Sequence, residues 1–171
     1  LGERVEEVTL SETFDYAHGW QKTIMLADLA KNFMVDELKG RDKISKVLCE
    51  MLDEGKEYKA VAYNEAVEHI DVLNNLLAEV FEKFNAIITP ATTGEAPKGL
   101  DATGSPTFCT LWTYCGMPAV TIPVMQGSNG LPVGVQIVGP KGDDARVLQC
   151  ARWLMESLAP EDLAEENMAE E

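Results

Sequence analysis

The sequence has few basic residues and lacks the segments that direct a chain to a membrane. It contains 14 Lys and Arg against 29 Asp and Glu, which gives a formal net charge of -15. A field of that sign repels phosphate backbones and anionic lipids, so we expect neither nucleic acid nor a membrane surface as a partner. No apolar run approaches the roughly 20 residues that span a bilayer, and no charged-then-apolar leader is present.

Metal-binding and disulfide patterns are also missing. Neither His18 nor His69 has a second His or Cys at ligand spacing, so we expect no metal. The glycine-rich turn at residues 139–142 leads into two acids that would repel phosphate, which favours a helix cap and no cofactor. The four cysteines form no C-x-x-C pair and lie in apolar contexts. We therefore expect buried free thiols and a cytoplasmic location.

A recognisable catalytic serine is absent as well. A serine nucleophile needs an adjacent base and fixed donors for the oxyanion. None of the five serines lies in a G-x-S-x-G elbow, and Ser105 and Ser128 have the surroundings of loop and turn residues. The sequence therefore predicts no catalytic residue within this chain.

Hydrophobic periodicity predicts helices followed by a mixture of strands and helices. Helical stripes cover residues 14–38, 43–52 and 56–83, and Gly55 is expected to end the second helix. A further helix is expected from a cap at Asp143 and Asp144 to Leu158. Short strands are expected at residues 5–10, 86–89, 119–122 and 133–138, with Pro123 ending the third. This order is typical of an α/β fold with a mixed sheet and helical layers.

The ends of the sequence favour a piece of a longer chain. It opens on Leu1 without an initiator Met, and its four expected strands are few for a buried sheet. Acids crowd residues 161–171, which we interpret as a solvated helix end or a disordered tail. We therefore expect one domain segment over residues 1–160 and an acidic tail.

Four motifs occur in a fixed order: FNAIITPA, GMPAVTIPV, LPVGVQIVG and GDDARVLQCARWL. In that order they resemble the C-terminal part of the amidase signature family, serine hydrolases that cleave amide C–N bonds. The matching positions are residues 86–91, Gly116, Pro118, Ala119, residues 134–136, Gly139, Asp144 and Leu148. The resemblance implies an amidase-signature-like fold.

The resemblance also implies a chemistry that this chain does not carry. The family uses a Ser, a cis-Ser and a Lys, which have no counterpart here, so they are expected upstream and the 171 residues alone are expected to be inactive. The parent protein would hydrolyse a small carboxamide through an acyl-enzyme. Its expected partners are the amide substrate and the missing N-terminal part, with a homo-oligomer left open. The A subunits of glutamyl-tRNA amidotransferases carry an Arg and an Asp that are absent here, which disfavours that subgroup.

The resemblance places the segment that begins at Thr107, with Phe108 and Trp112, near the substrate. Aromatic residues four positions apart are also typical of a core-facing helix, and that alternative stays open. Two other functions stay open too. One is a non-catalytic binding or assembly module that keeps this half of the fold, and the other is an unrelated acidic α/β domain.

Overall fold

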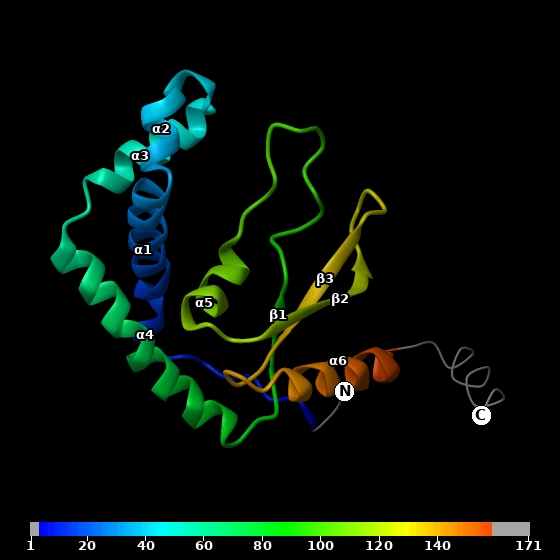
Figure 1. Ribbon diagram of the computed structural model, residues 1–171. Coiled ribbons are helices and arrows are strands. Elements are labelled where there is room, and N and C mark those ends of the chain that lie inside the picture. Colours follow the sequence, from blue (N-terminus) through cyan, green and yellow to red (C-terminus); the bar gives the residue numbers. More distant parts are fainter. Residues whose placement is uncertain (1–3, 159–171) are drawn as a thin grey trace. The chain divides into compact units, whose positions relative to one another are not determined.

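The structure is a computed structural model that describes residues 4–158. The described chain forms two compact units (Figure 1). Unit 1 holds residues 4–10 and 76–158, and unit 2 holds residues 11–75. The acidic segment 161–171 lies outside the described residues. Each unit is described separately.

Unit 2 is helical. Its elements are η2 (Glu12–Tyr16), α1 (Ala17–Asn32), α2 (Met34–Gly40), η3 (Arg41–Lys43), α3 (Lys46–Lys56) and the first part of α4 (Ala60–Phe81). The helix predicted over residues 14–38 is therefore wrong as one element, because it is interrupted at Phe33. Beyond that break Leu38 is 82% exposed, so α2 does not continue the buried stripe of α1.

Gly55 has a different role from the one predicted. It lies inside α3 and is buried, and the helix continues to Lys56. A Cβ atom at Gly55 would overlap the backbone carbonyl of Leu26 in α1. The missing side chain therefore lets α1 and α3 approach closely, which is a packing requirement that helix-stop rules do not reveal. At the other end of α3, the Ser45 hydroxyl caps the helix by accepting from the Leu48 amide at 3.3 Å.

Unit 1 contains a three-stranded antiparallel sheet in the order β1-β3-β2. The strands are β1 (Ile87–Pro90), β2 (Ala119–Gln126) and β3 (Pro132–Val138). The α/β class, with helices beside a sheet, is confirmed. The sheet was expected to be mixed, but the strands of the described chain all pair antiparallel. The strand predicted at residues 5–10 is wrong, because these residues pair with no strand within the described chain. Next to them, the guanidinium carbon of Arg4 lies 5.0 Å from the ring centre of Trp153.

Pro123 does not end the strand that precedes it. Strand β2 continues to Gln126, and its register with β3 shifts between Ile122 and Met125. Proline has no N–H to donate to a ladder, so it is accommodated where the pairing is irregular. Sequence reasoning identified the disruption correctly but took it for the end of the strand.

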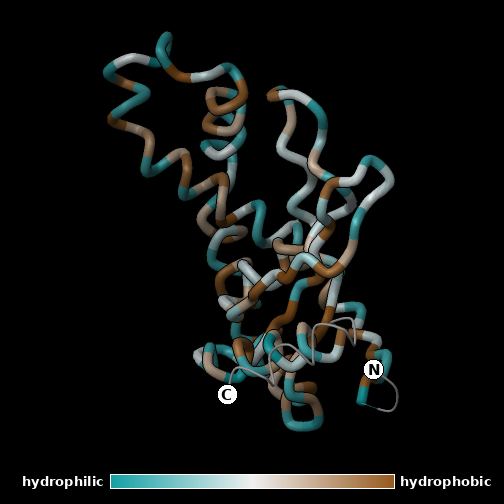
Figure 2. The backbone as a smooth tube through the Cα atoms, turned by 90° about the vertical axis from the view of Figure 1, so that its right-hand side faces the viewer, coloured by the Kyte–Doolittle hydropathy of each residue, from teal (hydrophilic) through white to brown (hydrophobic). Residues whose placement is uncertain are grey.

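Helix α6 (Asp144–Leu158) covers one face of the sheet. The predicted cap is confirmed, because a carboxylate oxygen of Asp143 accepts from the Arg146 amide at 3.2 Å. The buried core between α6 and the strands consists of Ile122, Ile137, Val147, Ala151 and Leu154. Along the helices in Figure 2, hydrophobic and hydrophilic residues alternate, as amphipathic packing requires.

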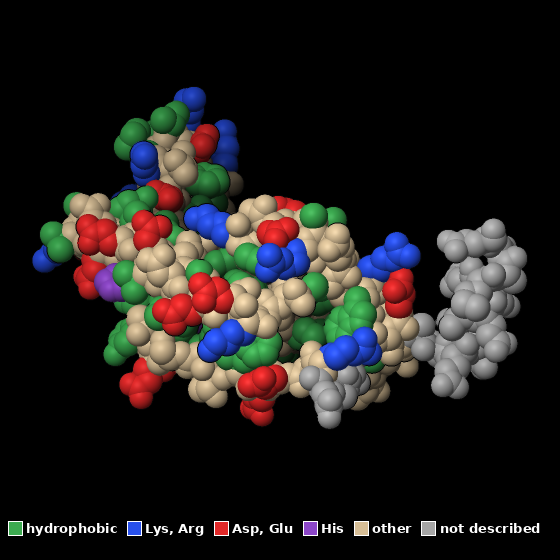
Figure 3. Space-filling view, turned by 90° about the horizontal axis from the view of Figure 1, so that it is seen from below, with side chains coloured by type: hydrophobic (Ala, Val, Ile, Leu, Met, Phe, Trp, Pro, Cys, Tyr) green, Lys and Arg blue, Asp and Glu red, His purple; other side chains and the backbone are tan. Residues whose placement is uncertain are grey.

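The surface carries many acidic side chains, which are spread over the face seen in Figure 3. Basic side chains occur among them in the same view. One ion pair of unit 1 joins Arg146 to Asp143, with Nε 2.8 Å from a carboxylate oxygen. Between residues 4 and 158, no helix is both long enough and apolar enough to cross a membrane.

Candidate functional site

The candidate site lies in unit 1, on the sheet face opposite α6. Successive residues of a strand point to opposite faces, so Ile137 packs toward α6 while its neighbour Gln136 points to the other side. Helix α5 (Thr107–Cys115) lies on that other side (Figure 1). The Gln136 residue is 4% exposed, and among residues 4–158 it is the only polar residue that is buried.

The amide group of Gln136 joins three parts of unit 1. Its Nε2 donates to the backbone oxygen of Phe108 in α5 at 3.0 Å and to Oγ1 of Thr89 in β1 at 3.2 Å. The thiol of Cys109 lies 3.8 Å from its Oε1. Breaking these hydrogen bonds would leave a buried amide without partners, which costs free energy. The network therefore fixes the position of the start of α5 on the sheet.

Local sequence sets both ends of α5. The helix starts after Pro106, whose carbonyl accepts from the Cys109 amide at 2.8 Å, and the Ser105 hydroxyl accepts from the Thr107 amide at 3.3 Å. It ends at Gly116, which adopts the left-handed conformation with φ 66° and ψ 34°. Glycine is the residue best suited to that backbone geometry at a helix C-terminus. The G-x-P-A motif therefore starts with a helix stop.

The structure brings two of the three predicted substrate-binding residues to the start of α5. Thr107 and Phe108 are half-buried in its first turn, and the Phe108 carbonyl accepts from the Gln136 side chain. Trp112 lies one turn further along and is only 5% exposed, in the same buried stretch as Tyr114 and Cys115. The first turn of α5 therefore offers side-chain surface that Trp112 does not.

Sequence reasoning did not assign a role to Gln136 or Thr89. The signal was available, because a single amide side chain interrupts the apolar strand VGVQIVG. A polar residue at a position predicted to be buried requires hydrogen-bond partners, and here they come from a strand and a helix distant in sequence. Which partners these would be could not be read from the sequence.

A carboxylate ties the loop before α5 to the hairpin turn between β2 and β3. The carboxylate of Glu95 accepts from the backbone amide of Asn129 at 2.7 Å, from its side-chain amide at 2.5 Å and from the Leu131 amide at 3.3 Å. These bonds, the Asn129 side chain foremost, hold the pKa of Glu95 below its usual range. The loop of residues 91–106 is thus anchored at Glu95.

The thiols of unit 1 differ in environment. All four cysteines of the chain are free, as predicted, but only Cys115 is buried, and Cys109 is exposed, contrary to prediction. Burial raises the pKa of the Cys115 thiol to about 11 and that of the neighbouring Tyr114 hydroxyl to about 12. A thiol with so high a pKa stays protonated at neutral pH and is a poor nucleophile.

The described residues contain no assembled hydrolytic centre. Within residues 4–158, no serine hydroxyl contacts a lysine or histidine, and no group of three or more His, Cys, Asp or Glu is placed to hold a metal ion. What this part of the chain provides is a helix start held rigidly on a sheet. Such an element can line a pocket and position a bound molecule.

Comparison with known proteins relates the chain to amidases and to an amidotransferase subunit. The family described as Amidase matches residues 9–148. The A subunit of the glutamyl-tRNA(Gln) amidotransferase of Halothermothrix orenii is 33% identical over 85 residues, which is 46% of this chain and 18% of that protein. The chain therefore covers about a fifth of the length of that curated relative.

Two solved structures share the fold at low sequence identity. A crystal structure of an amidase superposes with a TM-score of 0.78 at 22% identity, over 88% of this chain and 37% of the other. The structure of a 6-aminohexanoate cyclic dimer hydrolase gives a TM-score of 0.68 at 22% identity, over 84% and 36%.

Proposed function

Because the chain belongs to the amidase family, we propose that it is part of a serine amidase that hydrolyses the C–N bond of a small carboxamide through an acyl-enzyme. The observation that carries the proposal is the family match over residues 9–148. The fold that the chain shares with solved amidases supports it. The four ordered motifs of unit 1 lie in or beside the segments that form α5, the sheet and α6.

The reaction needs groups that we place outside these 171 residues, upstream in the sequence. A serine oxygen attacks the amide carbon and transfers its proton to a base, and fixed donors hold the oxyanion. The base then protonates the nitrogen as the C–N bond breaks, which leaves a seryl ester that water hydrolyses. A second serine and a lysine would serve as the base, as the family resemblance implies.

The contribution of this chain would be a wall of the substrate pocket. We place Thr107 and Phe108 against the substrate, because both are half-buried at the start of α5. Trp112 would belong to the same pocket wall. It lies one helical turn further along α5, is more deeply buried, and would support Thr107 and Phe108 from behind. Gln136 would be a positioning residue, since it holds the Phe108 carbonyl at 3.0 Å without facing the substrate itself.

The relative from Halothermothrix orenii bears the name of the subgroup that the sequence analysis disfavoured. That relative is named as an amidotransferase subunit, which makes a multi-subunit assembly a second candidate for the parent protein. The similarity covers 18% of that protein, and the Arg and Asp associated with the subgroup are missing here. We therefore favour an amidase whose nearest partner is the preceding part of its own chain.

The proposal is tested by comparing the 171-residue chain with the same segment joined to its upstream coding sequence. The longer protein should hydrolyse simple carboxamides and take one label from a serine-directed fluorophosphonate. The short chain should do neither, because losing a single oxyanion donor or base already costs roughly a hundredfold or more. Labelling of the short chain at Ser105 or Ser128 would contradict the assignment. A longer protein that takes no label would favour the non-catalytic module.

The same longer protein tests the wall residues. Replacing Phe108 by Ala should weaken turnover of bulky amides roughly tenfold more than that of small ones, because a lost apolar contact affects only substrates that make it. Thr113→Ala, at an exposed position on the same helix, is the matched control. If Phe108→Ala and Trp112→Ala lower all rates equally and reduce stability, both side chains belong to the core.

A further inference from the structure

Unit 2 contains a groove that the proposed amidase reaction does not use. We propose that this groove binds a small alkylated or quaternary ammonium ion. Its volume is about 410 Å³, and it is lined by Glu12, Thr13, Tyr16, Trp20, Glu65 and His69. Small-molecule sites in proteins typically enclose about 300 to 1,000 Å³. The volume of the groove falls within this range, and the groove is open to solvent.

Aromatic side chains form one part of the groove. The ring centres of Tyr16 in η2 and Trp20 in α1 lie 5.7 Å apart with a tilt of 33°. Tyr16 is 65% exposed, so its ring is accessible to a ligand. The faces of aromatic rings carry negative electrostatic potential, and indole and phenol rings attract organic cations.

Trp20 is held in place from α4. Its ring stacks on the imidazole of His69, with centres 4.0 Å apart and an interplanar angle of 22°. The Nδ1 atom of His69 lies 2.7 Å from the backbone oxygen of Glu65, one helical turn earlier. A carbonyl oxygen can only accept, so Nδ1 carries a proton in this contact. The indole is therefore fixed before any ligand arrives, which lowers the entropic cost of binding.

Two carboxylates give the groove its charge. Glu12 and Glu65 both line it, and no lysine or arginine does. Within residues 4–158, neither glutamate forms an ion pair, whereas the unit 2 carboxylates Glu37, Asp53 and Glu54 are all paired. Two carboxylates without an ion-pair partner, in a groove that aromatic rings also line, are complementary to a cation and repel an anion.

The combination favours an organic cation over a metal ion. Metal sites need three or more convergent ligands, and the described residues contain no such group. An alkylated ammonium instead spreads its charge over methyl or methylene groups, which contact ring faces while the carboxylates supply longer-range attraction. Two rings in an open groove predict weak binding, with a dissociation constant on the order of 1 mM.

The test is a titration of the ¹⁵N-labelled 171-residue chain with choline chloride, at ionic strength matched with NaCl. The three tryptophan indole N–H signals, from Trp20, Trp112 and Trp153, report binding, and Trp20→Phe assigns the first. The uncharged isostere 3,3-dimethylbutan-1-ol has the same shape as choline without the charge. We expect choline to shift the Trp20 signal saturably, with at least roughly tenfold weaker binding of the isostere.

Variants separate the two sources of affinity. Glu65→Gln should weaken choline binding roughly threefold to tenfold, and Tyr16→Ala by a similar factor. Glu68→Gln is the matched control, because Glu68 is exposed on the same helix and does not line the groove. Tyr16 is the ring chosen for truncation, because an exposed side chain contributes little to the core.

Three outcomes would overturn the proposal. One is a linear shift of the Trp20 signal with no saturation. Another is an equal response to choline and to the uncharged alcohol, which would show an apolar groove without cation selectivity. The third is unchanged choline binding in both Glu65→Gln and Tyr16→Ala. None of these depends on amidase activity, so this site and the proposed reaction can fail independently.

Discussion

The two units of this protein place their polar interactions in different environments. In unit 1, the buried amide of Gln136 donates to a carbonyl and a hydroxyl, and Glu95 accepts from neutral N–H groups. In unit 2, Glu37 pairs with Arg41 and with Lys56, whose Nζ lies 2.7 Å away, and Asp53 pairs with the same two cations.

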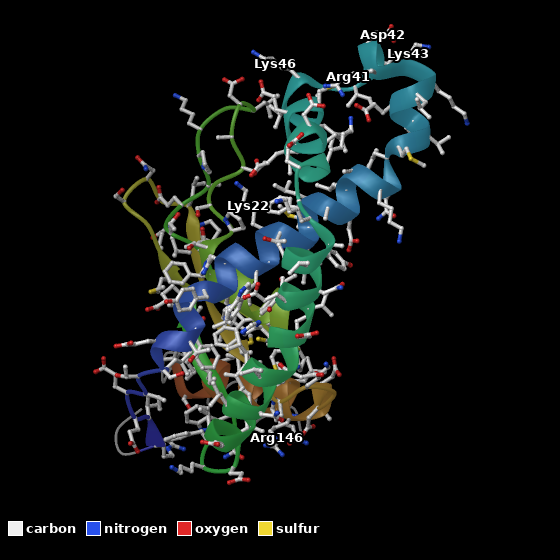
Figure 4. The ribbon with its side chains drawn as sticks, turned by 90° about the vertical axis from the view of Figure 1, so that its left-hand side faces the viewer. Lys22, Arg41, Asp42, Lys43, Lys46 and Arg146 are labelled. Carbon is white, nitrogen blue, oxygen red and sulfur yellow. The ribbon has the colours of Figure 1, made fainter. Side chains whose placement is uncertain are left out.

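In this charged group the side chains of Arg41, Asp53 and Lys56 are exposed, whereas that of Glu37 is partly buried. Figure 4 shows Arg41 near Asp42, Lys43 and Lys46. Exposed ion pairs stabilise little and weaken in salt, while buried neutral hydrogen bonds are insensitive to salt but costly to break. The element that we assign to the substrate is therefore held by the kind of interaction that resists changes in the medium.

Each unit also has a buried glycine at a close contact between two elements, and the two glycines differ in what an added side chain would meet. A Cβ at Gly55 in unit 2 would overlap the backbone oxygen of Leu26, whereas one at Gly139 in unit 1 would meet the side chain of Val147. A side chain can rotate away and a helical backbone cannot move without its helix. We therefore expect a Gly→Ala substitution at Gly55 to destabilise unit 2 more than the same substitution at Gly139 destabilises unit 1.

The largest effect is expected for Gly55→Ala, which should destabilise unit 2 by about 3 kcal/mol because α1 and α3 must separate. Urea unfolding followed by thiol alkylation distinguishes the units, since Cys49 lies in unit 2 and buried Cys115 in unit 1. Cys49 should become reactive at lower urea in the variant. Gly19→Ala is the control, because nothing lies within 4 Å of its added Cβ. Equal midpoints for Gly55→Ala and Gly19→Ala would refute the packing role.

A somewhat smaller loss is expected in unit 1 from Gln136→Leu. The change leaves the Phe108 carbonyl and the Thr89 hydroxyl without their partner and should lower stability by about 2 kcal/mol. Alkylation of Cys115 in urea reports the loss. Gln149→Leu, at an exposed position on α6, is the matched control and should change little. A neutral result for Gln136→Leu would mean that the network does not hold α5.

The smallest effect concerns the Glu95 anchor and depends on pH. Because its pKa is lowered in the folded state, its stabilising contribution is complete above the ordinary value of 4.5 and is lost as pH falls through the lowered pKa. Glu95→Gln should speed amide exchange at Asn129 and Leu131 roughly threefold to tenfold at neutral pH. The difference from the wild type should shrink in acid.

High salt should leave the Glu95 effect intact, since its partners are neutral, and should weaken the Glu37 pairs of unit 2. Asp101→Asn is the control, at an exposed position in the same loop. Unchanged exchange at Asn129 in Glu95→Gln would show that the loop is not anchored there.

Local sequence rules worked where the deciding partners are close along the chain. The Asp143 cap, the apolar face of α6 and the three strands of unit 1 follow from patterns of a few residues. The predicted substrate residues Thr107, Phe108 and Trp112 fall on one helix, as their spacing suggested. The rules failed where a contact distant in sequence determines the role of a residue. Gly55 is an example, because its role depends on the backbone of Leu26.

The sequence by itself determined the family, the α/β class and the excess of acidic charge, because ordered motifs, periodicity and composition are properties of the chain. Only the tertiary structure decided that Gln136 joins β1, β3 and α5 and that Glu95 anchors a loop. It also placed Trp20 on His69 beside two carboxylates. The Gln136, Glu95 and Trp20–His69 contacts each join residues at least 28 positions apart. Contacts at that range leave no periodic pattern in a sequence.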